Sequence, residues 1–472
     1  MNGRIQALAH KAQDRENDSP DHGKHNKPNR CGIRPEAARP PPNATGTILR
    51  PIVKWSRLFY DASTNGPKDI FQVTTPRLRL YDTLLKAHFA RDRQMAFVSG
   101  PRQVGKTTTC RFEGTDYLNW DNADDRRLIL RGPAAVAERL GLERLRTPRP
   151  IAVFDELHKH VKWKSFLKGF FDVYGERIHL IVTGSSRLDV FRRGGDSLMG
   201  RYFLYRMHPF SVAECLRITA PSTPIQPPMP LSDADWAALW QHGGFPEPFL
   251  RRESTFTVRW RALRHDQLMK EDIREVAQVQ DLGALEHLSL LLAEHTAQQL
   301  IFSSLAQEVG VATDTVRRWV DLLERLHFGF RVRPWFNNVS KALRKEPKWF
   351  LRDWSGIEDD GARAETFVAC HLLKAVEGWS DLGLGRFELR YLRDKLKREV
   401  DFLIVRDRKP WFLVEVKTRD TALSDSLRYF QAATRASHAF QVVMELPYVD
   451  VDCFSRSDPA IVPARTLLSQ LL

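Results

Sequence analysis

The segment GPRQVGKT, residues 100–107, restricts the folds open to this chain more than any other part of it. Its glycines, Gly100 and Gly105, allow backbone N–H groups to wrap around an anion at the N-terminus of a following helix. Lys106 can then place a cation on the β and γ phosphates of a nucleotide, and the Thr107 hydroxyl can bind the accompanying magnesium. The alternative is an ordinary glycine turn before a helix. The expected nucleotide-binding residues are Gly100, Gly105, Lys106, Thr107 and Thr108.

The sequence around this loop has the order that a nucleotide-binding unit requires. A helix is predicted near residues 80–90, and a strand predicted for Met95 to Val98 runs directly into the first glycine. Strand, glycine loop and helix in succession are typical of α/β folds that bind phosphate. We therefore expect an α/β core within residues 51–219.

A second motif lies at the end of another predicted strand. Residues 151–154, IAVF, form a hydrophobic run typical of a buried strand, and Asp155 and Glu156 follow it. Asp155 can hold the magnesium shell, and Glu156 can polarise a water molecule. An acidic pair after a strand is by itself usually a solvated strand end. In one chain with the loop, and at this spacing, the pair becomes specific for a nucleotide site.

Two further candidates are weaker. A third strand, Ile178 to Val182, runs into Thr183, Gly184 and two serines, and one of these hydroxyls can sense a γ-phosphate or simply cap a turn. Arg201, between Gly200 and Tyr202, can stabilise transferred phosphoryl charge in cis or from a neighbouring subunit, or it can be an ordinary surface arginine.

Composition narrows the class of protein. The 472 residues suggest about three domains. The chain has 72 Lys and Arg against 58 Asp and Glu, and the resulting net charge of +14 favours polyanionic partners.

Five scattered cysteines form no C-x-x-C pair for zinc or redox chemistry, so a reducing cytoplasm fits best. We expect a soluble, cytoplasmic protein with no signal peptide and no membrane span. Residues 1–50 are predicted to be a disordered basic tail.

Residues 220–352, in the middle of the chain, are predicted to be mainly helical. A proline-rich stretch at 220–230 marks a boundary, residues 220–280 are expected to form a helical lid, and residues 281–352 a winged helix. In its last helix Thr313 can cap the N-terminus, and Val316, Val320 and Leu323 share one apolar face. Arg317 and Arg318 then point elsewhere, where they can meet DNA. A winged helix is also a common protein-interaction fold.

The last segment, residues 353–472, carries a group of carboxylates. We expect a helix at 362–373, strands near Leu389, Val400 and Leu413, a helix through Leu427 and a final strand at 440–444. Asp401 opens one strand, while Glu415 and Lys417 share a face of the next because side chains alternate along a strand. Glu365 can join them from the helix. Such a set can bind Mg²⁺ and activate water against a phosphodiester, or it can be the solvated face of two amphipathic strands.

Five motifs in this order resemble a prokaryotic family of AAA-like P-loop ATPases with a C-terminal restriction-endonuclease-like, PD-(D/E)xK domain. They are GPRQVGKT, VFDELHK, IVTGSS, LMGRY and PFSVAE, and the resemblance spans roughly residues 80–445. It implies an α/β ATPase core, a helical lid, a winged helix and a nuclease-like end. The basic N-terminal segment departs from the family pattern.

The resemblance also implies roles for individual residues. Lys106, Thr107, Asp155 and Glu156 fall on the family's ATP and magnesium positions. Ser186 falls on its sensor position and Arg201 on its arginine motif, and the EVDFLI and VEVK segments match its C-terminal domain. Nuclease-like domains often persist as binding modules, so cleavage stays an open alternative.

We therefore expect an ATPase that uses Mg²⁺ and ATP to drive a conformational change in a DNA-associated role. The alternative is a nucleotide-gated regulator, or a DNA- or protein-binding module, with little turnover and an inactive nuclease-like domain. DNA and further copies of the chain are the candidate partners, and a membrane is not.

Overall fold

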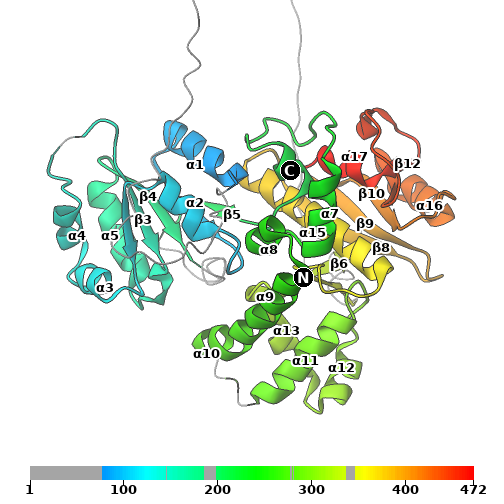
Figure 1. Ribbon diagram of the computed structural model, residues 1–472, viewed down its shortest axis with the longest axis horizontal. Helices are drawn as coiled ribbons and strands as arrows, with labels where there is room; N and C mark the ends of the chain where they lie inside the picture. The colour runs from blue at the N-terminus through cyan, green and yellow to red at the C-terminus, as the bar shows by residue number, and fades with distance from the viewer. Residues whose placement is uncertain (1–76, 145, 185–197, 277–278, 280, 336–345) are drawn as a thin grey trace, which may run out of the picture. The chain divides into compact units, whose positions relative to one another are not determined.

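The structure is a computed structural model that describes residues 77–144, 146–184, 198–276, 279, 281–335 and 346–472 (Figure 1). These residues belong to one compact unit that spans 73–472. The expected tail at residues 1–50 and the expected sensor, Ser186, lie outside the described residues. Within the described part of the chain, no helix is both long enough and apolar enough to cross a membrane.

A five-stranded parallel sheet carries the glycine loop, with the strand order β2-β3-β4-β1-β5. Its strands are β1 Met95–Ser99, β2 Asp116–Asn119, β3 Ile151–Asp155, β4 His179–Thr183 and β5 Tyr202–Arg206. A parallel sheet is covered on both faces, so its strands are continuous hydrophobic runs rather than alternating ones. All five residues of β1 are buried, as this requires. The expected α/β class with a parallel sheet is confirmed.

Helices cover both faces of this sheet. They are α1 Leu80–Arg91, α2 Lys106–Glu113, α3 Ala123–Leu130, α4 Pro133–Arg139, the short η1 Leu157–Lys159 and α5 Trp163–Tyr174. Successive side chains of β1 point to opposite faces. Val98 therefore packs with the side of α1 and α2, and Phe97 with the side of α4 and α5.

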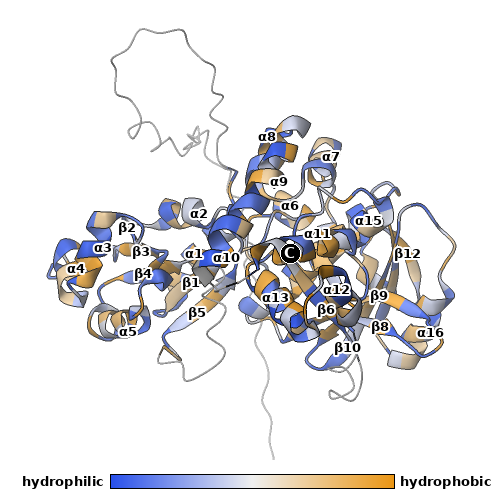
Figure 2. Cartoon of the chain, turned by 90° about the horizontal axis from the view of Figure 1, so that it is seen from below, coloured by the Kyte–Doolittle hydropathy of each residue, from blue (hydrophilic) through white to orange (hydrophobic). Residues whose placement is uncertain are grey.

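The next segment is helical. It comprises α6 Val212–Leu216, α7 Asp233–His242, α8 Pro246–Arg251, α9 Ser254–Gln267, η3 Leu268–Asp272, α10 Ile273–Val276, α11 Leu282–Glu294, α12 Phe302–Val309 and α13 Thr313–Arg325. Many helices show both hydrophobic and hydrophilic positions in Figure 2, as expected for helices that bury one side.

Helix α13 has the predicted apolar face but not the predicted cap. Val316, Val320 and Leu323 are buried, whereas Arg317 and Arg318 are exposed. The expectation that Thr313 caps the helix is wrong, because Thr313 is already the first helical residue and Ala312 holds the cap position without a side-chain hydrogen bond.

A seven-stranded mixed sheet follows, with the order β12-β11-β10-β9-β8-β6-β7. Its strands are β6 Gly329–Pro334, β7 Lys348–Leu351, β8 Phe387–Arg393, β9 Glu399–Arg406, β10 Lys409–Lys417, β11 His438–Val443 and β12 Ala460–Pro463, and its helices are α15 Asp360–Asp381, α16 Asp425–Thr434, η4 Cys453–Ser455 and α17 Ala464–Ser469. From α15 to β11 the elements follow the order that the sequence predicts.

The strand after α13 belongs to this larger sheet. Strand β6 pairs antiparallel with β7 and parallel with β8, through Arg333 beside Arg390 and Pro334 beside Tyr391. In the sequence, Phe328, Phe330 and Val332 alternate with Gly329, Arg331 and Arg333, which is the pattern of a half-buried strand and predicts β6, whereas β7 is not predicted. The hairpin β6–β7 therefore joins the three preceding helices to the C-terminal sheet by backbone hydrogen bonds.

Candidate nucleotide-binding site

Both glycines of the loop are required by the backbone. Gly100 has φ +148°, and a Cβ there would lie 2.3 Å from the carbonyl oxygen of Met207. Gly105 has φ +101°, a conformation that residues with a side chain rarely adopt, and α2 begins at the next residue. The loop thus leads from the end of β1 to a helix N-terminus, where backbone N–H groups favour an anion.

Lys106 lies against the inside of the loop. Its Nζ donates to the carbonyl oxygens of Gly100 and Pro101, both at 2.8 Å, and the residue is only 7% exposed. Burial lowers the pKa of Lys106 to about 8, although the carboxylates of Glu156 and Asp155 act in the opposite direction. An anion placed at the loop would therefore stabilise an ammonium group that burial now disfavours.

The expected magnesium ligands contact each other. Thr107 Oγ1 donates to Asp155 Oδ2 at 2.9 Å, and Asp155 is 4% exposed at the end of β3. The structure therefore brings together the hydroxyl and the carboxylate that the sequence assigns to magnesium. The chemistry of this donor pair fits Mg²⁺, which is usually bound by one or two protein oxygens together with substrate phosphates and water.

Tyr117 is a further group at this site that the sequence analysis misses. It lies on β2, next to β3 in the sheet, and its hydroxyl donates to the same Asp155 Oδ2 at 2.6 Å. The Arg111 guanidinium stacks 3.8 Å from the centre of its ring. The only sequence signal that could have found Tyr117 is the short segment DYLN, residues 116–119, which lies between the glycine loop and the strand that ends in Asp155. Tyr117 fixes the orientation of the Asp155 carboxylate.

Glu156 is held in an unusual conformation beside Asp155. Its φ is +54°, and its backbone N–H donates to Thr183 O of β4 at 3.0 Å. Its Oε2 is buried and accepts no hydrogen bond from any described residue, with His158 Nε2 at 3.6 Å and Lys159 Nζ at 3.7 Å. Burial, and then the charge of Asp155, raise the pKa of Glu156. The result is an available acceptor that is more basic than an ordinary glutamate.

Arg201 does not lie near the loop. Its carbonyl oxygen accepts the N–H of Met95 at the start of β1, whereas the loop follows the end of β1. Five residues at about 3.3 Å each separate the two ends by roughly 16 Å. The Arg201 Nε bonds Asp172 of α5 at 2.7 Å. The cis alternative for Arg201 is therefore wrong, because Arg201 lies at the amino ends of the strands, whereas the loop lies at their carboxyl ends.

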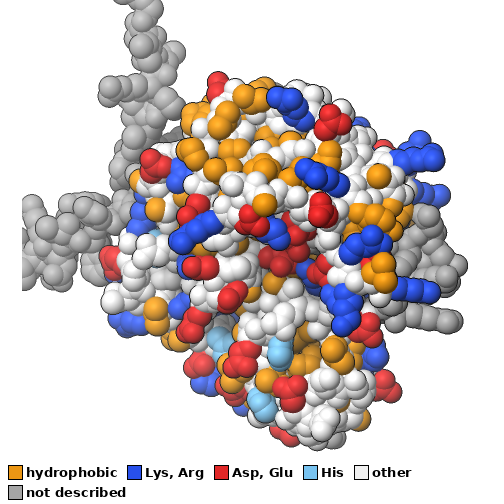
Figure 3. All heavy atoms as spheres, turned by 90° about the vertical axis from the view of Figure 1, so that its right-hand side faces the viewer, with side chains coloured by type: hydrophobic (Ala, Val, Ile, Leu, Met, Phe, Trp, Pro, Cys, Tyr) orange, Lys and Arg blue, Asp and Glu red, His pale blue; other side chains and the backbone are white. Residues whose placement is uncertain are grey.

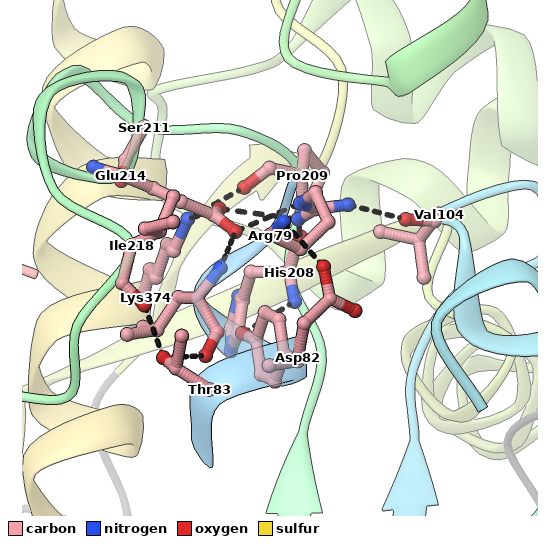
Figure 4. Close-up of polar contacts among 12 residues, drawn as sticks. Arg79, Asp82, Thr83, Val104, His208, Pro209, Ser211, Glu214, Ile218 and Lys374 are labelled. Carbon is pink, nitrogen blue, oxygen red and sulfur yellow. Dashed lines mark hydrogen bonds and ion pairs between the residues drawn. The ribbon is translucent and has the colours of Figure 1, made fainter. Parts of the chain in front are cut away.

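A buried ionic chain runs from the loop to the C-terminal part (Figure 4). Arg79, just before α1, donates to Val104 O of the loop at 2.7 Å and from Nε to Glu214 Oε1 of α6 at 2.7 Å. Lys374 of α15 donates to the other oxygen of Glu214 and to Pro209 O. The side chains of Arg79, Glu214 and Lys374 are at most 6% exposed. Burial opposes ionisation of Glu214, but Arg79 and Lys374 outweigh it and lower the Glu214 pKa to about 2.

This series of buried ion pairs could not be predicted from the sequence alone. Glu214 lies within the PFSVAE motif, which carried part of the resemblance, but nothing in the sequence paired it with Arg79 or Lys374.

The expected carboxylates of the C-terminal part lie close to one another. Glu415 Oε1 accepts from Lys417 Nζ at 2.9 Å, so the two share a face as predicted, while Asp401 Oδ2 accepts from the backbone N–H of Val416 at 2.9 Å. Glu365 Oε1 and Asp401 Oδ1 both bond Lys348, at 2.8 and 3.3 Å. Burial and the charge of Asp401 raise the pKa of Glu365 to about 8 and that of Glu415 to about 7.

Three families match successive parts of the chain. Residues 92–216 match the family described as AAA domain, and residues 233–357 and 360–451 match two domains of unknown function, DUF8612 and DUF4143. Among curated proteins, the uncharacterized proteins Mb2031c of Mycobacterium bovis and Rv2008c of Mycobacterium tuberculosis are each 24% identical over 353 residues, which cover 71% of this chain and 73% of the relative.

A search of solved structures finds the Aeropyrum pernix ORC1 protein in complex with DNA, at 14% identity and a TM-score of 0.28, covering 64% of this chain and 95% of that one. So low a TM-score does not establish a shared arrangement. The AAA domain match, by contrast, contains the loop and the acidic strand end described above, and it supports an ATP-binding, AAA-like ATPase core for this chain.

Proposed function

We propose that this chain binds ATP with Mg²⁺ at residues 100–107 and hydrolyses it. The proposal rests chiefly on the 2.9 Å contact between Thr107 Oγ1 and Asp155 Oδ2 beside the loop. A loop hydroxyl and a strand-end carboxylate are the protein groups that hold magnesium in P-loop ATPases. When bound, Mg²⁺ neutralises charge on the β and γ phosphates.

The other residues of the site have complementary roles. Lys106 exchanges two neutral carbonyl acceptors for phosphate oxygens, to which charge-assisted hydrogen bonds are stronger. Glu156 accepts a hydrogen bond from the attacking water through Oε2, which accepts none from a described residue, and orients that water. Tyr117 keeps Asp155 in position.

The test is equilibrium ATP binding and steady-state ATP hydrolysis by the full chain, with Lys106→Ala as the site variant. We expect Lys106→Ala to abolish or strongly weaken both, because it removes the cation that faces the phosphates. The matched control is Lys168→Ala on α5, which is exposed and should behave as wild type. Wild-type ATP affinity in Lys106→Ala would contradict the proposal.

For Arg201 we propose a role at the site of a neighbouring copy of the chain. A cation supplied from another subunit stabilises the charge of the transferred phosphoryl group. Arg201→Ala and Glu156→Gln proteins would then each be inactive alone but regain turnover when mixed, because some sites combine an intact Glu156 with an intact Arg201. A mixture without turnover removes this assignment.

A DNA-associated role is the finer part of the proposal. It rests on the net charge of +14 and on the exposed Arg317 and Arg318 of α13. Replacing both by alanine should lower DNA affinity and flatten its dependence on salt, since each phosphate contact releases counterions. An unchanged salt slope would point to another surface.

The alternative is a nucleotide-gated module with little turnover. The observation that favours it is the buried chain from Val104 through Arg79 and Glu214 to Lys374, because it ties the loop to helix α15. Multiple turnovers per chain would exclude this alternative.

A further inference from the structure

Lys348 lies at the centre of the C-terminal carboxylates. It is the first residue of β7, at the edge of the seven-stranded sheet, and its side chain is 5% exposed. Its Nζ lies 2.8 Å from Glu365 Oε1 of α15, 2.6 Å from Glu399 Oε1 and 3.3 Å from Asp401 Oδ1 of β9. Three carboxylates from two different elements therefore converge on one ammonium group.

Two of these three carboxylates are groups that the sequence assigns to a divalent cation. An ammonium group has three donors, so Lys348 can give one to each of Glu365, Glu399 and Asp401. A magnesium ion needs oxygen ligands at about 2.0–2.1 Å, so an ion bound by Glu365 Oε1 and Asp401 Oδ1 would have to lie where Nζ now lies. The other oxygen of Asp401 is held by the backbone N–H of Val416.

Cations also pair with the neighbouring carboxylates. Glu415 directs Oε1 to Lys417, while its Oε2 is buried without a hydrogen bond from a described residue, and Glu399 is additionally paired with Arg393. Over the ranges that the structure describes, no group of three or more acidic, histidine or cysteine side chains is arranged to hold a metal ion. Glu365, Glu399 and Asp401, as Lys348 holds them, therefore do not fit a divalent cation at this place.

Charge supports the same conclusion. Four carboxylates, Glu365, Glu399, Asp401 and Glu415, face three cations, Lys348, Arg393 and Lys417, so three of the four negative charges that would attract a metal are already matched within the protein. Figure 3, which views the side of the molecule that carries the C-terminal sheet, shows acidic side chains in the middle of the face with Lys and Arg side chains around them.

We infer that the ammonium group of Lys348 takes the place of the metal ion, and that the C-terminal part does not cut nucleic acid through Glu365, Asp401 and Glu415. The cluster instead joins three segments: the hairpin β6–β7 that follows the helices α11–α13, helix α15 and strand β9. This inference is independent of the ATPase proposal, because it involves none of the residues at the loop.

The test measures Mn²⁺ binding to the full chain without nucleotide, by electron paramagnetic resonance, in an Asp155→Asn background that disables the magnesium position at the loop. In this background, we expect the further change Asp401→Asn to leave the Mn²⁺ stoichiometry unchanged, and Lys348→Met to add about one Mn²⁺ per chain. Adding Asp401→Asn to Lys348→Met should remove the gained ion. Lys348→Arg is the matched control, since it keeps the charge and should gain nothing.

Two results would overturn the inference. One is a loss of about one Mn²⁺ on Asp401→Asn alone, or Mn²⁺-dependent DNA cleavage that this substitution abolishes. The other is a folded Lys348→Met chain that gains no Mn²⁺. If Lys348→Met does not fold, the comparison of the chain with and without Asp401→Asn still decides whether these carboxylates hold a metal.

Discussion

Glu214→Gln is the substitution whose effect the structure defines most sharply. It keeps the size of the side chain but removes the charge between Arg79 and Lys374, both of which are buried. Two cations would then remain inside the protein with no anion beside them. Because Arg79 also bonds Val104 O of the loop, the change acts on the nucleotide site as well as on stability.

The size of the effect follows from the pKa of Glu214, which is lowered from 4.5 to about 2. At 1.36 kcal/mol per pH unit, this corresponds to about 3 kcal/mol at neutral pH. Removing one partner of a buried ion pair costs a similar 3–5 kcal/mol or so. Because the folded pKa is below the unfolded one, the stabilisation is complete above pH 4.5 and is lost as the pH falls through about 2.

The assay is scanning calorimetry at pH 7.5 together with ATP affinity. At about 2.1 cal/mol/K per residue, a unit of roughly 400 residues unfolds with an entropy of about 0.84 kcal/mol/K, so a loss of about 3 kcal/mol lowers the melting temperature by roughly 3–4 °C. Glu253→Gln is the matched control, since its exposed pair with Arg251 should matter little. Glu214→Gln combined with Lys374→Met should recover part of the loss, because one unpaired cation is gone. A Glu214→Gln protein that melts within about 2 °C of wild type would refute the reasoning.

Three other predictions concern single residues. Glu156→Gln should leave ATP affinity intact and slow turnover roughly 100-fold or more, and equal turnover by steady-state assay would remove Glu156 from the mechanism. Arg201→Ala should leave ATP affinity unchanged in equilibrium binding, since Arg201 lies at the end of the strands opposite the loop. A tenfold loss of affinity would contradict this. Burial lowers the pKa of His371 to about 3, and its Nε2 accepts the N–H of Val212 at 3.1 Å. The unfolded chain therefore takes up this proton first, and we expect the melting temperature to fall as the pH drops from 6.5 towards 3, less steeply in His371→Gln.

The nucleotide loop could be predicted because its chemistry is local in sequence. Gly100, Gly105 and Lys106 lie within seven residues, and glycine is the residue type that readily adopts the positive φ found at positions 100 and 105. The pairing of Thr107 with Asp155 was predictable as well, since the carboxyl ends of parallel strands and the loop meet at one edge of a sheet.

The other interactions depend on contacts that no local pattern encodes. Glu214 is 135 residues from Arg79 and 160 from Lys374, and each of the three would be read from sequence as an ordinary surface charge. Strand β7 is a four-residue edge strand without alternation, so its Lys348 gave no sign that it would be buried among carboxylates. Whether Arg201 acts in cis or from a neighbouring subunit could not be decided from the sequence, because a motif fixes the identity of a residue but not the end of the sheet at which it lies.

The two buried lysines of the C-terminal part, Lys374 and Lys348, explain why carboxylates that look alike in sequence differ in chemistry. Each lysine saturates the acids that it meets: Lys374 one oxygen of Glu214, and Lys348 one oxygen each of Glu365, Glu399 and Asp401. A carboxylate oxygen that a buried cation holds can bind a metal ion only after that bond is broken. Glu156 differs, because its buried Oε2 accepts no hydrogen bond from a described residue, and the nearest cationic nitrogens, of His158 and Lys159, lie at 3.6 and 3.7 Å. Catalysis is therefore expected at the glycine loop, and the lysine-held carboxylates are expected to hold the structure around it.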